Sequence, residues 1–142
     1  MKKNLLINTI LVLLFLNSNV ISKESNYFID GMKHFNNREF DKSKILFERD
    51  LVFNPKSEKS YLYLAKIFKE KEKDIQEEHN LNNVLVLNPQ NEEALYLMTL
   101  LKIKQSNYSE ARELIEKFDL VCKLFCSKTK EVKEKFEKLI PE

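Results

Sequence analysis

Apolar residues recur every three or four positions along most of the chain, the spacing that places them on one face of an α-helix. Polar and turn-forming residues interrupt this pattern at regular points. The pattern therefore predicts seven helices of about a dozen residues each. They are expected at about residues 24–36, 40–53, 58–71, 75–87, 92–105, 108–121 and 128–140.

Capping and helix-stopping residues support these boundaries. Ser57 and Asn91 each precede a predicted helix, where a side-chain oxygen can accept hydrogen bonds from the free amide groups of the first turn. Pro55 and Pro89 follow two other helices, because proline cannot continue the backbone hydrogen-bond ladder. Several helix ends are thus marked in the sequence itself.

The pattern repeats with a period of 34 residues, so that Asn54 and Pro55 recur as Asn88 and Pro89. Other positions in this register are Gly31, Ala65 and Thr99; Glu24, Glu58 and Glu92; Tyr27, Tyr61 and Leu95; Phe47, Leu81 and Ile115; and Phe53, Leu87 and Val121. Each unit contains two amphipathic helices. Units of this length are typical of proteins that stack helical hairpins into an array.

The repeat resembles the tetratricopeptide repeat (TPR) family. The residues of the first unit that stand at the family's spacing are Gly31, Phe40, Ser43, Phe47 and Pro55. The matching residues of the third unit are Tyr108, Ala111 and Ile115. The resemblance covers about residues 24–123.

This resemblance implies an all-α fold, a TPR-type α-solenoid of about three helix-turn-helix repeats. We expect a TPR-like domain over residues 23–142, with repeats at about 24–57, 58–91 and 92–123. The last helix, at about 128–140, has one apolar face and one face on which Lys and Glu alternate. It is expected to cap the final repeat.

The middle unit departs from the family pattern at two positions. Glu77 stands where the family has a small residue, and Asp74 where it has an aromatic one. Asp74 and Glu77 have the spacing of a capping box, as do Asn107 and Glu110. We therefore expect capped second helices in both units and looser packing around Glu77.

Residues 1–22 have the pattern of a secretory signal peptide, with two lysines before the apolar run Leu5–Leu16 and a polar stretch after it. Val20 and Ser22 fit the positions before a cleavage site, so we predict cleavage after Ser22. The apolar run is shorter than the roughly 20 residues that span a bilayer. An uncleaved anchor and a structural helix are the alternatives.

Composition and charge narrow the class of protein. One Gly and three Pro among 142 residues, with 43% hydrophobic residues, favour a helical globular chain. Without Lys2 and Lys3 the exported chain has 22 basic and 22 acidic side chains. This balance does not support nucleic-acid binding or electrostatic capture by an anionic membrane. We expect no stable membrane insertion after cleavage and an exported, periplasmic location.

Cys122 and Cys126 would meet an oxidising compartment after export. Their spacing is not that of a thioredoxin-type motif, and Ser127 does not fit haem attachment. Three interpretations stay open: a disulfide, two free or packed thiols, and a soft-metal site. Residues four apart in a continuous helix lie near the limit of disulfide reach. A bridge therefore predicts that the helix breaks near Cys122.

The sequence offers little material for catalysis. His34 and His79 have no partners at the spacing of a metal site or a catalytic triad, and a single glycine leaves no phosphate-binding loop. We expect no enzyme activity, no cofactor and no metal.

The TPR resemblance implies a concave face, lined by the first helices, that binds peptides or protein segments. The predicted groove residues are Phe28, Met32, Phe35, Asn36, Leu62, Lys66, Lys69, Tyr96, Leu100, Ile103 and Lys104. Such a groove would be apolar at both ends and basic in the middle, which suits a segment with apolar anchors and an acidic centre. For several of these residues, Phe28 and Phe35 among them, the alternative is packing between helices.

The resulting hypothesis is an exported TPR adaptor that binds a segment of another protein, with envelope assembly as its setting. Two alternatives from other classes are kept. One is a self-associating repeat protein that forms a homodimer, and the other is a thiol or metal carrier that uses Cys122 and Cys126.

Overall fold

The computed structural model describes residues 24–140, and the regular structure in this range is α-helical throughout. The helices are α2 (Asn26–Asn36), α3 (Phe40–Phe53), α4 (Glu58–Glu70), α5 (Asp74–Leu87), α6 (Glu92–Lys104), α7 (Tyr108–Val121) and α8 (Cys126–Glu137). Their ends lie within three residues of those predicted from the sequence. The predicted signal peptide, residues 1–22, lies outside the described residues.

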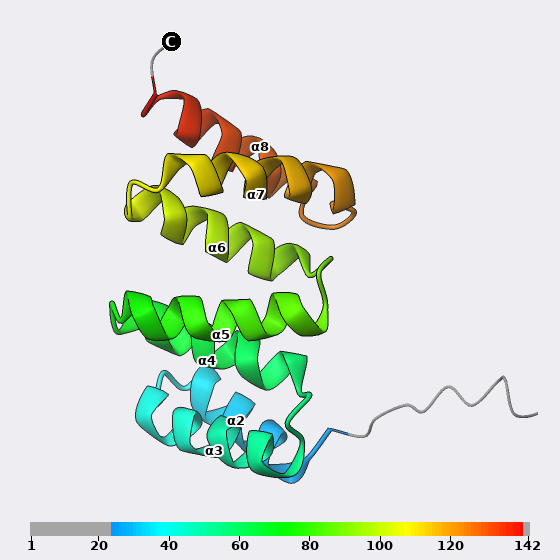
Figure 1. Cartoon of the computed structure of the whole chain (residues 1–142). Coiled ribbons are helices and arrows are strands. Elements are labelled where there is room, and N and C mark those ends of the chain that lie inside the picture. The colour runs from blue at the N-terminus through cyan, green and yellow to red at the C-terminus, as the bar shows by residue number, and fades with distance from the viewer. Residues whose placement is uncertain (1–23, 141–142) are drawn as a thin grey trace, which may run out of the picture.

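The helices form consecutive antiparallel pairs that stack into an array (Figure 1). Helix α2 pairs with α3, α4 with α5, and α6 with α7, and α8 packs on both helices of the last pair. The predicted all-α solenoid with a C-terminal capping helix is thus confirmed. No helix within residues 24–140 combines the length and the apolar character that a membrane span requires.

The hydrophobic core is continuous from one unit to the next, because each of its three clusters joins neighbouring units. The first cluster contains Phe28, Phe47, Leu64, Ile67 and Phe68. The second contains Leu62, Ala65, Leu81, Val84, Ala94, Leu97, Met98 and Leu101. The third, between the last pair and α8, contains Ile103, Ala111, Ile115, Val132 and Phe136. No unit buries its apolar face alone.

The two helices of the first unit approach closely at the chain's single glycine. A Cβ placed on Gly31 would lie 2.7 Å from Cε1 of Phe47, a ring that is fully buried. Ser43, on the same helix as Phe47, donates its hydroxyl to the carbonyl of Gly31 at 2.8 Å. The equivalent first-helix residues, Ala65 and Thr99, are also completely buried.

The turn inside each unit places one residue in the left-handed region. The φ angles are 59° at Arg38, 54° at Glu72 and 59° at Ser106, and these positions are 34 residues apart. Glycine is the usual residue at this helix-ending position. The chain instead uses polar residues there, so its repeated turn does not require further glycines.

Helix capping agrees with the sequence at three of the four predicted positions. Ser57, Asn91 and Asn107 accept hydrogen bonds from first-turn amides at 3.4, 2.7 and 3.4 Å. The capping box at Asp74 is wrong. Helix α5 begins at Asp74 with Lys73 as its cap residue, and no side chain caps it.

Glu77, the expected partner in that box, is instead buried with 4% of its surface exposed. It occupies the register position of Ser43 and Ala111, which are both fully buried. Burial raises the pKa of the Glu77 carboxyl to about 7, against the opposing influence of Lys69. A large ionisable side chain therefore lies where the other units have small residues.

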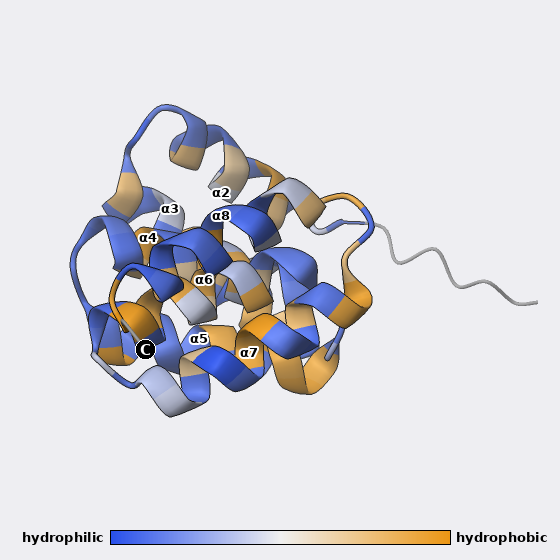
Figure 2. Ribbon diagram, turned by 90° about the horizontal axis from the view of Figure 1, so that it is seen from above, coloured by the Kyte–Doolittle hydropathy of each residue, from blue (hydrophilic) through white to orange (hydrophobic). Residues whose placement is uncertain are grey.

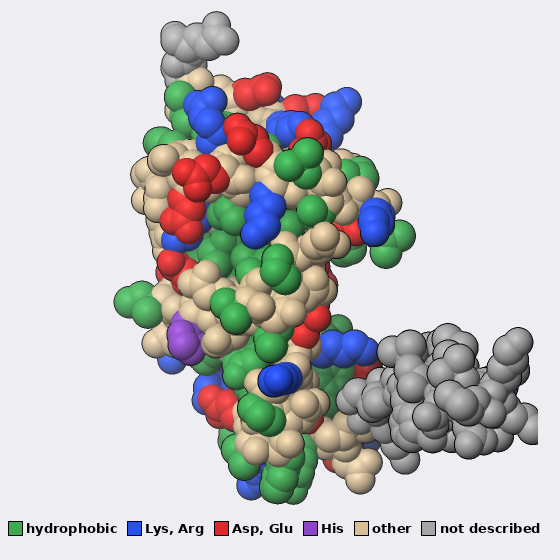
Figure 3. Space-filling model, turned by 45° about the vertical axis from the view of Figure 1, so that its right-hand side comes forward, with side chains coloured by type: hydrophobic (Ala, Val, Ile, Leu, Met, Phe, Trp, Pro, Cys, Tyr) green, Lys and Arg blue, Asp and Glu red, His purple; other side chains and the backbone are tan. Residues whose placement is uncertain are grey.

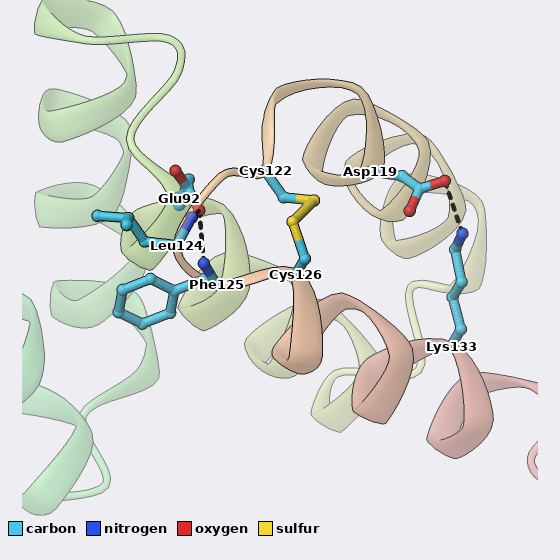
Figure 4. The surroundings of a disulfide bond; sticks show 7 residues. All are labelled: Glu92, Asp119, Cys122, Leu124, Phe125, Cys126 and Lys133. Atoms are coloured by element: carbon cyan, nitrogen blue, oxygen red, sulfur yellow. Dashed lines mark hydrogen bonds and ion pairs between the residues drawn. A yellow bond between two sulfur atoms is a disulfide. The ribbon is translucent and has the colours of Figure 1, made fainter.

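Glu58 and Glu92, at the starts of α4 and α6, form hydrogen bonds with the turns that follow α5 and α7. The Glu58 carboxylate accepts hydrogen bonds from the side-chain amides of Asn88, at 3.0 Å, and Asn91. The Glu92 carboxylate accepts from the backbone amides of Leu124, at 3.0 Å, and Phe125, at 2.8 Å (Figure 4). Hydrogen bonding to the backbone amides of Lys123, Phe125 and Leu124 holds the pKa of Glu92 below its usual value. Each glutamate thereby joins its own helix to the turn that closes the unit.

The turn between α7 and α8 contains a disulfide between Cys122 and Cys126, whose Cα atoms are 5.2 Å apart (Figure 4). Helix α7 ends at Val121, and Cys122 has extended backbone angles. The break that a bridge requires is therefore present. Lys133 of α8 also forms an ion pair with Asp119 of α7 at 2.7 Å.

The substitution Gly31→Ala tests the close helix approach. We expect it to lower the free energy of unfolding by about 1–3 kcal/mol, because the added methyl group overlaps a buried ring that cannot move aside. Urea unfolding followed by circular dichroism measures this. Asp30→Ala, at the exposed neighbouring position, should change stability by less than about 0.5 kcal/mol. Equal effects of the two substitutions would contradict the close approach.

The substitution Glu77→Gln tests the buried carboxyl. The folded protein keeps a proton that the unfolded chain releases near pH 4.5, so stability falls as pH rises toward about 7 and stays reduced above it. We expect the variant to lack this loss, which is about 3 kcal/mol. Urea unfolding from pH 4 to 8 measures the difference. In the control Glu78→Gln, whose parent carboxyl pairs with Lys102 at 2.6 Å, stability should fall at neutral pH.

The double substitution of Cys122 and Cys126 by serine tests the bridge. We expect a loss of about 2 kcal/mol in the free energy of unfolding, from the greater entropy of the unfolded chain. Mass spectrometry after alkylation should find no free thiol in unreduced protein. Two alkylated cysteines in protein taken from an oxidising compartment would overturn the disulfide.

Candidate functional site

The first helices of units one and two carry the larger of two adjoining depressions. It has a volume of about 560 Å³ and is lined from α2, α4 and the start of α6. Its apolar lining residues are Phe28, Ile29, Met32, Leu62 and Tyr63. Phe28 and Leu62 are buried, with 5% and 8% of their surfaces exposed, so they form the floor. The depression is open enough to receive an apolar side chain from another molecule.

The second depression, of about 390 Å³, lies farther along the same helices. Its lining residues are Phe35, Asn36, Arg38, Phe40, Lys66, Lys69, Glu70 and Leu97. Phe35 and Phe40 meet edge to face, with ring centroids 5.6 Å apart. This depression therefore has an aromatic wall and a charged rim.

Tyr63 stands between the two depressions and is held by three aromatic neighbours. Its ring centroid lies 5.9 Å from that of Phe28, 5.0 Å from Phe35 and 5.4 Å from Phe47. The ammonium group of Lys66 lies 4.5 Å from the ring centroid. Contacts of this kind on several sides fix the orientation of the ring, so the wall of the site is formed before any ligand binds.

The charges around the site are mostly paired. Lys66 binds Glu93 at 2.6 Å, Lys59 binds Glu24 at 2.5 Å, and Arg38 binds Glu70 at 3.2 Å. Lys69 is exposed and forms no ion pair with any residue in 24–140. The expected basic middle of the groove is therefore narrower than predicted, because Glu93 neutralises Lys66.

The sequence matches no protein-family model and no curated protein. Several solved structures are similar over most of the described chain. The Arabidopsis OM64 TPR domain has a TM-score of 0.73 at 15% identity, covering 80% of this chain and 93% of that one. The Sgt2 TPR domain from Aspergillus fumigatus has a TM-score of 0.67 at 16% identity, covering 80% and 78%. The chain has the TPR fold.

A third structure with this fold is the first TPR of Spaghetti (RPAP3), bound to the HSP90 peptide SRMEEVD. Its TM-score is 0.71 at 16% identity, and the match covers 80% of this chain and 90% of that chain. Identities this low establish the shared fold alone. The TPR architecture inferred from the 34-residue period is confirmed by these comparisons.

Within this TPR fold, seven of the eleven predicted groove residues line the two depressions. The larger depression contains Phe28, Met32 and Leu62, and the smaller contains Phe35, Asn36, Lys66 and Lys69. Phe28 and Leu62 also belong to the hydrophobic core. Packing and groove lining are therefore not alternatives for these two side chains, because each does both.

The four predicted residues of unit three do not line either depression, because α8 covers that part of the first-helix face. Ile103 is 5% exposed and clusters with Val132 and Phe136 of α8, and Leu100 packs against the same cluster. The Tyr96 hydroxyl donates to Glu131 at 3.2 Å.

The fourth of these residues, Lys104, pairs with Asp74 of α5 at 2.6 Å. Its ammonium group is therefore directed to the start of α5 and not to either depression. The expectation of a groove that extends over unit three is corrected by these contacts.

The structure adds site residues that the sequence reasoning missed. Ile29, Tyr63 and Leu97 line the depressions and lie 34 residues apart. The 34-residue repeat could have identified them, because Ile29 and Tyr63 directly follow the predicted Phe28 and Leu62. Glu93 was missed because its role depends on a contact between units.

The two histidines form no catalytic arrangement with their neighbours. His34 is hydrogen-bonded through Nδ1 to the Glu39 carboxylate, and His79 is exposed beside α3 and α4. Across residues 24–140, no three side chains of the metal-binding types gather into a site.

Proposed function

We propose that this chain is an exported interaction adaptor that binds a segment of another protein in the two depressions on α2 and α4. One observation carries the proposal: a preformed apolar depression of about 560 Å³ adjoins a second one that has the exposed Lys69 on its rim. Pockets with an apolar floor and a few polar groups at the rim are typical of ligand sites. The TPR fold supports a protein or peptide as the partner.

The chemistry of the lining indicates the kind of segment. Phe28, Met32 and Leu62 suit a large apolar side chain, which would be desolvated between them and the wall formed by Tyr63. Lys69 suits an acidic residue placed farther along the segment. The first TPR of RPAP3, a structural neighbour, is bound to a peptide that contains two consecutive glutamates. This neighbour supports a peptide as ligand.

Export and a periplasmic location are part of the proposal. They are supported by the signal-like pattern of residues 1–22 and by the bridge between Cys122 and Cys126, since disulfides persist in oxidising compartments. Assembly of envelope proteins is the setting that fits an exported adaptor without catalytic groups.

The structure bears differently on the two alternatives, a thiol or metal carrier and a self-associating protein. With both sulfur atoms in the bridge, neither cysteine offers a thiolate to hold a metal. Self-association stays an alternative, since Ile29 is 50% exposed at the mouth of the larger depression and could receive a second copy.

A photo-crosslinking side chain in place of Met32 tests the proposal in the full chain, expressed in cells of the source. We expect one protein to be crosslinked, because Met32 lies in the larger depression. A probe at Ile75, 81% exposed on α5, is the matched control and should not capture this protein. Mass spectrometry of the adducts identifies the partner and the attached peptide.

Combining the Met32 probe with Lys69→Glu should lower the adduct yield severalfold, because the acidic part of the partner would be repelled. Lys117→Glu, at an exposed position on α7, should leave it unchanged. Equal capture from Met32 and Ile75 would refute the site. An adduct between two copies of the chain would establish self-association instead.

A further inference from the structure

Three segments at the ends of the second helices lie along one edge of the stack. They are residues 52–57, 86–91 and 120–125, each consisting of the last helical residues and the turn that follows. We call them together the turn edge. Figure 1 shows all three turns on the right-hand side, where the described chain also begins.

The turn edge presents apolar side chains to solvent at every level of the stack. Val52, Val86 and Leu120 are 76%, 81% and 87% exposed, and they recur at the 34-residue interval. Phe53 and Leu124 are 72% and 87% exposed. Figure 2 shows apolar segments on this side, and Figure 3, which turns the edge forward, shows hydrophobic side chains at several heights. A repeated apolar row of this kind marks a contact surface.

The turn edge carries basic side chains beside its apolar tips. Its three segments contain Lys56 and Lys123 and no acidic residue, and neither lysine forms an ion pair within the described range 24–140. The nearest glutamates, Glu58 and Glu92, accept hydrogen bonds from the turns themselves. Apolar side chains with lysines beside them are complementary to a membrane surface that has anionic headgroups over an apolar interior.

The chain enters the folded unit at this same edge. The Ser25 hydroxyl is hydrogen-bonded to Asp50, and the ring of Tyr27 stacks on that of Phe53 with centroids 5.6 Å apart. The residues that precede them include the apolar run Leu5–Leu16, which a membrane receives during export or retains as an anchor. The described chain therefore begins at the turn edge, and the residues that precede it in the sequence have the pattern of a membrane-targeting segment.

We propose that the turn edge rests on the surface of an anionic lipid bilayer. The apolar tips enter the interface, and Lys56 and Lys123 meet the headgroups. A second copy fits less well, because antiparallel pairing of two edges would place Lys56 of one copy near Lys123 of the other. The zero net charge of the exported chain does not oppose the contact, because Lys56 and Lys123 lie on the edge itself and form no ion pair within residues 24–140.

Vesicle co-sedimentation tests this contact. Residues 23–142 are used, since the three core clusters lie wholly within residues 28–140. The vesicles contain phosphatidylglycerol with phosphatidylcholine, or phosphatidylcholine alone. We expect binding to the anionic vesicles, and severalfold weaker binding after Lys56→Gln with Lys123→Gln.

The decisive comparison uses two triple variants that add the same charge. The edge variant carries Val52→Glu, Val86→Glu and Leu120→Glu, and should bind at least about tenfold more weakly. The control variant carries glutamate at exposed apolar positions away from the edge, namely Ile45, Ile75 and Leu139. It should stay within about twofold of the parent. Circular dichroism verifies that both are folded.

Three results would overturn the proposal. The parent chain could fail to bind either vesicle, or the edge and control variants could lose binding equally. In the third, the parent chain would sediment as a dimer and bind no vesicles, and the edge variant would sediment as a monomer. The turn edge would then be a contact between two copies of the chain. Because the test uses none of the residues that form the two depressions, its failure would leave the adaptor proposal standing.

Discussion

The close crossing of two helices within each unit is the constraint on which the rest of the structure depends. At Gly31 the first helix comes so near to α3 that a methyl group would overlap the ring of Phe47. The smallest residue thus faces a fully buried aromatic ring, and Ser43 donates a hydrogen bond to the Gly31 carbonyl across the same contact. Because the crossing sets how each hairpin presents its apolar residues, it also sets how neighbouring units stack into one core.

The architecture could be predicted from the sequence because every repeat contains the local signals that determine it. A period of 34 residues, caps such as Ser57 and stops such as Pro55 depend on local chemistry, which does not change with the surroundings. The box at Asp74 failed for the opposite reason. Its spacing was correct, but tertiary packing buried Glu77 between helices, and the helix began one residue earlier than the box requires.

The candidate site could be predicted less completely, because it depends on contacts between elements that do not share the repeat. Helix α8 lies outside the 34-residue register, and only its position shows that Leu100 and Ile103 are covered. The pairing of Lys66 with Glu93 likewise joins two units. The usable face is therefore confined to units one and two. The capping helix, while it protects the end of the array, takes the third unit out of the groove.

The glutamates that close the units also decide what the chain presents at its edge. Glu58 and Glu92 direct their carboxylates to the turns after α5 and α7, where amide groups hold them. Their negative charge is thereby committed to the internal structure, while Lys56 and Lys123 stay at the surface beside apolar tips. A chain with equal numbers of acids and bases can thus present lysines beside apolar side chains at one edge. In unit one the same register position holds Glu24, which pairs with Lys59 instead, so the contact between glutamate and turn belongs to units two and three.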